Sequence, residues 1–235
     1  IYTRVSCDRP KYGMEKPAGF DIAELKGMMP VCSWTTIQHV ISVCTWFIFF
    51  MYIEHLGERS LAVSNIVRGV SGLLWMVTEA FASTCSTLVS NIIGAGREDK
   101  VWSLLKRILK LSYGVVMSFA LLFCIFPSAV ISIYTDIPDL IPATIPSMVV
   151  MCSSYLFTVG AMVLFQAVSG TGSTKTAFRL ELAALVIYTL YCTLIVGFMK
   201  LDIAICWTAE HVYAIGLLVL CYAYMKSGRW KNRAI

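Results

Sequence analysis

The chain has 235 residues, of which 58% are apolar and 14% charged, and its formal net charge is +5. Soluble domains carry about 25% charged residues, and one of this size cannot bury so much apolar surface. The composition therefore excludes a soluble domain and a disordered chain, and nine cysteines are too few for a disulfide-rich secreted scaffold. An all-α, polytopic membrane protein remains.

Charged residues separate six apolar stretches, each long enough to cross a membrane once. The predicted helices cover 30–54, 61–90, 108–134, 141–168, 177–199 and 203–225. We expect a cytoplasmic lead-in over 1–29, a six-helix lobe over 30–225 and a basic cytoplasmic tail over 226–235. Because the chain opens on Ile1 without a leader pattern, we expect it to be the C-terminal part of a longer protein.

Lysine and arginine segregate between the two sides of this topology. Of the 19, 16 fall in the lead-in, the second and fourth loops and the tail, and the exceptions are Arg59, Arg68 and Lys200. The positive-inside rule makes the basic side cytoplasmic. Topology thus explains the net charge, and no basic stripe with interleaved aromatic residues indicates nucleic-acid binding.

Glu79 lies near the middle of the second predicted helix, where inserting a charged side chain costs about 2.5–3.5 kcal/mol. Steps of three and four residues place it on one polar face. That face comprises Arg68, Gly72, Trp75, Glu79, Ser83, Ser86 and Ser90. The pattern predicts a cavity lining in which Glu79 exchanges a proton. The alternative is a structural Glu79, protonated or hydrogen-bonded to Ser or Thr of a neighbouring helix.

Two further helices carry polar candidates. One face of the first helix fits either a cavity lining or interhelical hydrogen bonding, and its residues are Trp34, Gln38, Ser42 and Thr45. In the sixth helix, Glu210 and His211 follow Asp202 by about two turns. We expect them near the outer interface, with Trp207 in the aromatic belt.

The sequence predicts no metal and no cofactor. The segment from Gly170 to Thr176 is not a Walker A loop, because Thr174 stands before Lys175 where that motif needs glycine. It instead predicts a tight cytoplasmic turn with a glycine helix cap. The cysteines form no C-x-x-C pair, and His39, His55 and His211 share no ligand spacing.

Three segments, in this order and spacing, resemble the multidrug and toxic compound extrusion (MATE) transporters. They are His55-Leu-Gly-Glu-Arg-Ser-Leu-Ala62, Val89-Ser-Asn-Ile-Ile-Gly-Ala-Gly-Arg97-Glu-Asp and Phe165-Gln-Ala-Val-Ser-Gly-Thr-Gly-Ser-Thr-Lys175. The resemblance is to the second six-helix lobe, helices seven to twelve of the family's twelve. It implies export of small organic cations, driven by an H⁺ or Na⁺ gradient, from a cavity between two rocking lobes. The partners it implies are membrane lipid and the missing N-terminal lobe.

This chain departs from the family pattern at two acids. Many members carry Glu eight residues after the proline of helix seven, and some carry Asp about eleven residues before the end of helix ten. The corresponding positions here are Gln38 and Thr158, so we expect no Na⁺ site in this lobe. The resemblance and the polar faces together give the expected ion- and substrate-binding residues, namely Glu79, Gln38, Trp34, Trp75, Ser83 and Thr158.

Three alternatives to an exporter stay open. A lipid-linked oligosaccharide flippase of the same architecture needs several cationic residues for a pyrophosphate, whereas only Arg68 is intramembrane. A membrane enzyme needs histidines and acids clustered at one interface, and the sequence gives no such cluster, so we expect no enzyme. A non-transporting accessory subunit fits a chain that is only one lobe.

Overall fold

The computed structural model describes residues 22–231. The chain divides into two compact units, 1–33 and 34–235. Within the first unit, residues 22–33 form the beginning of a helix that continues into the second. The expected lead-in therefore lies outside the described residues from 1 to 21, and its last part is helical. Everything below concerns the second unit.

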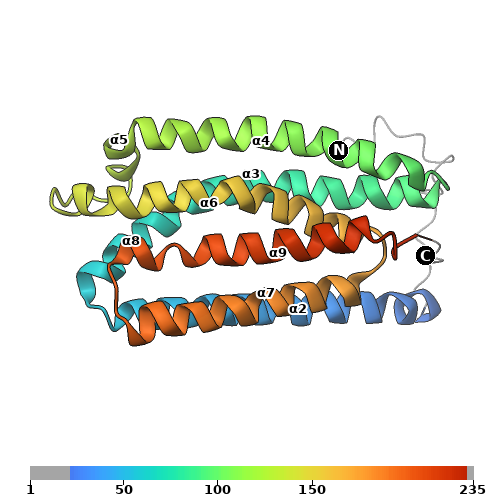
Figure 1. Cartoon of the computed structure of the whole chain (residues 1–235), viewed down its shortest axis with the longest axis horizontal. Helices are drawn as coiled ribbons and strands as arrows, with labels where there is room; N and C mark the ends of the chain where they lie inside the picture. Colours follow the sequence, from blue (N-terminus) through green and yellow to red (C-terminus); the bar gives the residue numbers. More distant parts are fainter. Residues whose placement is uncertain (1–21, 232–235) are drawn as a thin grey trace. The chain divides into compact units, whose positions relative to one another are not determined.

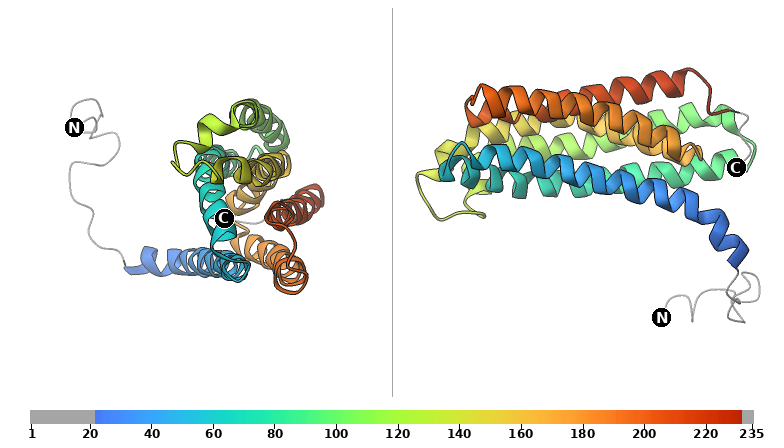
Figure 2. Two further views of the ribbon diagram at one scale, coloured as in Figure 1. Left: turned by 90° about the vertical axis from the view of Figure 1, so that its left-hand side faces the viewer. Right: turned by 90° about the horizontal axis from the view of Figure 1, so that it is seen from below.

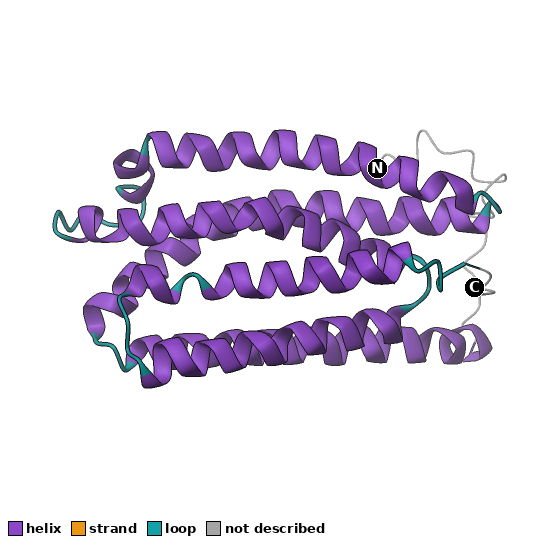
Figure 3. Cartoon of the chain, viewed as in Figure 1, coloured by secondary structure: helices purple, strands orange, loops and turns teal. Residues whose placement is uncertain are grey.

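Helices account for all regular structure in the described residues, as predicted, and no strand occurs between residues 22 and 231 (Figure 3). Six helical segments are long and apolar enough to cross a membrane. The elements are α2 (Ile22–Glu54), α3 (Glu58–Gly94), the 3-10 turn η1 (Glu98–Lys100), α4 (Val101–Ile125), α5 (Pro127–Ile131), α6 (Leu140–Gly170), α7 (Thr174–Cys192), the π-helical η2 (Thr193–Phe198), α8 (Ile203–Cys206) and α9 (Ala209–Lys226).

Two of the predicted spans differ from the observed helices. The third begins at Val101 rather than at residue 108, and it ends at Ile125 because Pro127 starts the separate short helix α5. The sixth is interrupted at Trp207 and Thr208, between α8 and α9. The Asp202 carboxylate accepts a hydrogen bond from the Ala204 N–H at 2.9 Å and caps the start of α8.

The helices of the second unit run side by side as a bundle (Figure 1), and α6 is its most enclosed member. In the most apolar window of α6, 72% of the residues are buried, against 22–39% in the other spans. It packs against α3, α4, α7 and α9, and the view down the bundle shows α3, α4 and α9 around it (Figure 2). The side chains of α6 therefore line much of the interior of the lobe.

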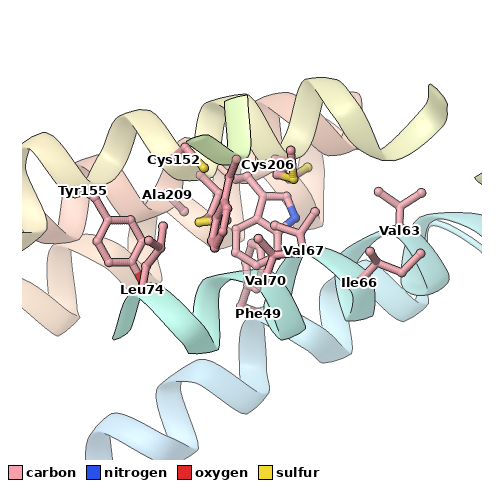
Figure 4. Close-up of a cluster of buried hydrophobic side chains, with 14 of the residues drawn as sticks. Phe49, Val63, Ile66, Val67, Val70, Leu74, Cys152, Tyr155, Cys206 and Ala209 are labelled. Carbon is pink, nitrogen blue, oxygen red and sulfur yellow. The ribbon is translucent and has the colours of Figure 1, made fainter. Parts of the chain in front are cut away.

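The core contains aliphatic residues of α3 that face α6. Figure 4 shows Val67, Val70 and Leu74 of α3 close to Cys152 and Tyr155 of α6. Outward-facing positions of the bundle are also apolar, and Met76, Leu190 and Phe198 are 71%, 67% and 79% exposed. In a membrane these side chains contact lipid, so their exposure carries no hydrophobic penalty.

The segment after α6 forms the predicted tight turn. The Thr171 N–H donates to the Ala167 and Val168 carbonyls, at 3.1 and 3.2 Å. Gly172 follows with a φ of +76°, the left-handed conformation that glycine tolerates best. The turn brings the end of α6 directly to the start of α7.

Candidate functional site

The polar face predicted on α3 lies on the outside of the bundle. Arg68, Trp75 and Ser83 are exposed, whereas Glu79 is partly buried. The buried residues of α3 occupy another side, which packs on α6, and Glu79 and Ser90 at the border of the polar face hydrogen-bond α6. The exposed surface also includes apolar side chains such as Met76. The polar residues that share a face by helical periodicity are therefore partly or fully exposed on the surface of the lobe.

Glu79 is anchored to the central helix. The Gln166 Nε2 of α6 donates a hydrogen bond to the Glu79 Oε1 at 3.1 Å. The sequence analysis allowed a bond from Ser or Thr of a neighbouring helix, and the donor is instead a glutamine 87 residues away. One anchored oxygen orients the carboxyl and is compatible with both roles expected for Glu79.

Arg68 makes its contacts with α2. Its guanidinium carbon lies 5.9 Å from the Trp46 ring centroid and 5.3 Å from that of Phe50. Aromatic faces attract cations at such distances. This arrangement keeps a charged side chain at the edge of α3 in favourable contact with apolar neighbours.

Gln38 faces a carboxylate that the sequence analysis overlooked. Together with Glu181 of α7 it lines a small pocket that leaves no room for a water molecule. Glu181 is 6% exposed, and its Oε1 accepts hydrogen bonds from the Ser42 hydroxyl at 2.6 Å and the Tyr213 hydroxyl at 3.4 Å. The predicted polar face of α2 therefore contributes Gln38 and Ser42 to the interior of the lobe.

Glu181 escaped the sequence analysis despite its place in the fifth helix. Glu181 was not among the candidates, although the predicted helix 177–199 contains it. In the structure α7 begins at Thr174, which puts Glu181 two turns inside. The available signal was the single acid of this helix, directly before an uncharged apolar run from Leu182.

Glu210 and His211 point into the lobe. The Glu210 carboxylate accepts bonds from the Tyr188 hydroxyl at 3.5 Å and from the Trp46 indole N–H. The His211 Nε2 lies 2.9 Å from the Ser153 Oγ of α6. Their partners on α2, α6 and α7 bring both side chains into the bundle.

The expectation that Trp207 sits in an aromatic belt is wrong. Its side chain is 1% exposed, its ring lies 5.4 Å from that of Phe49, and its indole N–H donates to the Ser64 hydroxyl at 3.4 Å. Trp207 lies in the break between α8 and α9, where the chain leaves the helical path assumed for 203–225. The prediction failed because it assumed that Trp207 lies in a continuous helix over 203–225.

His39 is an exposed residue of α2, next to Gln38 in sequence, and it is near enough to both Glu79 and Glu181 to interact with them electrostatically. The sequence analysis set His39 aside for lack of ligand spacing. Within residues 22–231, no three His, Cys, Asp or Glu side chains are arranged to hold a metal ion.

The remaining predicted site residues fall in separate places. Trp34 stacks near Phe178 with ring centroids 5.3 Å apart, and the Lys175 ammonium lies 5.6 Å from the Trp34 centroid. Thr158 is buried, and its hydroxyl donates to the Ser154 carbonyl at 3.0 Å. The six candidates therefore do not converge on one site, because Glu79, Trp75 and Ser83 face outward whereas Gln38 and Thr158 face inward.

Comparison with known proteins gives one match. The model of the MatE family matches residues 35–194, more than half of the chain. The match begins in α2 and ends in η2, and it includes Glu79, Gln166 and Glu181. No curated protein matches the sequence.

Proposed function

The chain belongs to the MatE family of efflux transporters, and we propose that it forms one six-helix lobe of an exporter that a cation gradient drives. Members of this family are transporters and not enzymes. The chain is a multi-pass membrane protein, with six helices able to span the bilayer. The proposal adds the coupling ion, the substrate class, the partner and the orientation.

The proposed partner is a second six-helix lobe that faces α3. Polar and charged side chains within a membrane face a bundle interior or a water-filled cavity. Arg68, Glu79 and Ser83 lie on a face that the helices of this lobe leave partly or fully exposed. A second lobe opposite α3 would enclose a wet cavity lined by this face, with lipid around the remaining apolar surface.

H⁺ is the proposed coupling ion, and Glu79 is the group that carries it. One observation supports this role. The Glu79 carboxyl is partly buried on the polar face of α3 and accepts a hydrogen bond from Gln166. A carboxyl at such a boundary binds a proton when water leaves and releases it when a cation approaches. This exchange is what drug–proton antiport requires.

Small organic cations are the proposed substrates. Trp75 lies one helical turn from Glu79 on the same face and is 42% exposed, so its ring can attract a cation while Glu79 supplies the negative charge. Trp34 is less suited to this role, because Lys175 already lies over its ring. We place the transporter in the cytoplasmic (inner) membrane with its C-terminus in the cytoplasm, since the 16 basic residues lie on that side.

Transport by the full-length protein with Glu79→Gln tests the proposal. The substitution keeps the side-chain volume and the bond from Gln166 but removes the titrating group. In proteoliposomes with an imposed pH gradient, we expect the variant to insert normally and to lose most of the export of cationic dyes, together with its pH dependence.

Ser83→Ala is the matched control, because Ser83 is exposed one turn further along the same face and carries no charge. We expect it to lose less export than Glu79→Gln and to keep the pH dependence. Wild-type rate and pH profile in Glu79→Gln would make Glu79 structural and move the coupling elsewhere.

A further inference from the structure

The lobe contains a second buried acid away from the outward face of α3. Glu181 projects from α7 toward α2 and α9, where it bonds Ser42 of α2 and Tyr213 of α9. Only 6% of its surface is exposed, against partial burial for Glu79. An acid this enclosed within an apolar bundle stays charged only if donors satisfy both of its oxygens.

The hydrogen bonds to Glu181 are one-sided. Both hydroxyl partners, Ser42 and Tyr213, contact Oε1, and the Ser42 hydroxyl also lies 2.9 Å from the Gln38 carbonyl oxygen. The other oxygen, Oε2, is buried and has no partner among the residues that the structure describes. So few donors fit a neutral carboxylic acid better than a carboxylate, because the neutral acid leaves no buried charge unsatisfied.

The pocket beside Glu181 suits a proton better than a metal ion. Four of its six lining side chains are apolar, and the lining residues are Gln38, Ile41, Phe178, Glu181, Leu182 and Leu185. Hard cations need several oxygen ligands, whereas this lining offers those of Gln38 and Glu181 alone. The pocket has no room for a water molecule, so a metal ion bound there could not keep hydrating water. A proton needs no hydration shell, because it binds directly to a carboxylate oxygen.

Ionisable groups face Glu181 from both helices that bond it. His39 acts from α2, and Tyr213 and Cys221 act from α9. Of these, His39 is the exposed one.

The two ionisable side chains of α6, which also packs on α7, are directed to other partners. Cys152 interacts with Cys124, and the Tyr155 hydroxyl bonds Ser71 of α3. Glu181 thus exchanges protons with the α2 and α9 sides alone.

A second acid is connected to Glu181 through a pair of tyrosines. Tyr213 of α9 bonds Glu181 of α7, whereas Tyr188 of α7 bonds Glu210 of α9. The two tyrosine rings lie 6.0 Å apart. These two hydrogen bonds link α7 to α9. Of the two helices that bond Glu181, α2 can therefore move away from Glu181 without breaking either of them.

We propose that Glu181 is a second proton-binding site of the transporter, loaded while its carboxyl is closed between α2 and α9 and unloaded when Ser42 moves away. On unloading, the carboxyl O–H bond breaks, the proton passes to entering water, and the electron pair stays on the carboxylate. The role of Glu181 in transport rests on the proposed antiport. The presence of a proton on Glu181 does not depend on that proposal.

Infrared spectroscopy of the full-length protein tests the site without transport. A protonated carboxylic acid has a carbonyl stretching band that shifts in D₂O. We expect this band at neutral pH in the wild type and a loss of part of its intensity in Glu181→Gln, while other protonated acids such as Glu79 keep the rest. That part should move to higher frequency in Ser42→Ala, because the carboxyl group loses its shorter hydrogen bond.

Glu54→Gln is the control, since Glu54 is an exposed acid at the end of α2 and its removal should leave the band unchanged. Unchanged intensity of the band in Glu181→Gln overturns the proposal. If Glu181→Gln does not fold, an unchanged frequency in Ser42→Ala overturns it. Loss of the wild-type band on adding Na⁺ at constant pH also overturns it, because a metal ion would then compete for the carboxylate.

The same preparations separate this inference from the proposed function. A band that depends on Glu181, in a protein that shows no pH-driven export, would leave the proton site standing and refute the antiport. Wild-type antiport with a band independent of Glu181 would refute this inference alone.

Discussion

The helices α3 and α6 approach each other closely at Gly170, and this makes Gly170→Ala a sharp test of the packing. A Cβ added there would lie 2.5 Å from the Ser86 carbonyl oxygen and 3.0 Å from the Ser86 Cα. Both are backbone atoms, so no side chain can swing aside. The Ser90 hydroxyl also donates to the Gly170 carbonyl at 2.8 Å and fixes the two helices in this register.

The expected cost follows from these distances. Normal carbon contacts need about 3.5–4.0 Å, so the helices must separate by about 1 Å at Gly170. Overpacking of this kind costs about 1–3 kcal/mol, and weakening the Ser90 bond adds about 0.5–1.5 kcal/mol. The better helix propensity of alanine offsets at most about 1 kcal/mol of this loss in stability. We expect a net loss of about 1–3 kcal/mol in the free energy of unfolding.

Denaturant unfolding of the full-length protein in detergent measures this loss. The control is Gly114→Ala in α4, where nothing lies within 4 Å of an added Cβ. That variant should be as stable as the wild type or slightly more stable. Equal stability of the Gly170→Ala and Gly114→Ala variants would refute the close approach of α3 and α6 at this point.

Two further predictions concern topology and the coupling ion. Because basic residues gather on one side, reporters fused in the connection 95–100 and after residue 226 should both be cytoplasmic, and an external C-terminus would contradict six spans. Because Gln38 and Thr158 are uncharged and the pocket beside Gln38 is largely apolar, a Na⁺ gradient at fixed pH should not drive export through this lobe. Export that follows the Na⁺ gradient and is lost in Gln38→Ala or Thr158→Ala would show this to be wrong.

The number of spans and the residues that share one polar face of α3 could be predicted from the sequence alone. A membrane crossing needs about 20 apolar residues, so charged residues mark its limits without reference to any neighbour. The period of 3.6 residues then fixes the angular position of each side chain on its own helix. Glu79 and Ser83 were assigned to one face by this period, and both lie on the partly or fully exposed side of α3.

The partners of the polar residues depended on the tertiary structure. Gln166 is 87 residues from Glu79, and Ser42 is 139 residues from Glu181. Angular position on one helix does not say which helix lies opposite. Hydropathy gives no help, because lipid and the lobe interior are both apolar. For the same reason Trp207 was placed toward lipid, whereas packing against Phe49 and Ser64 buries it in the core.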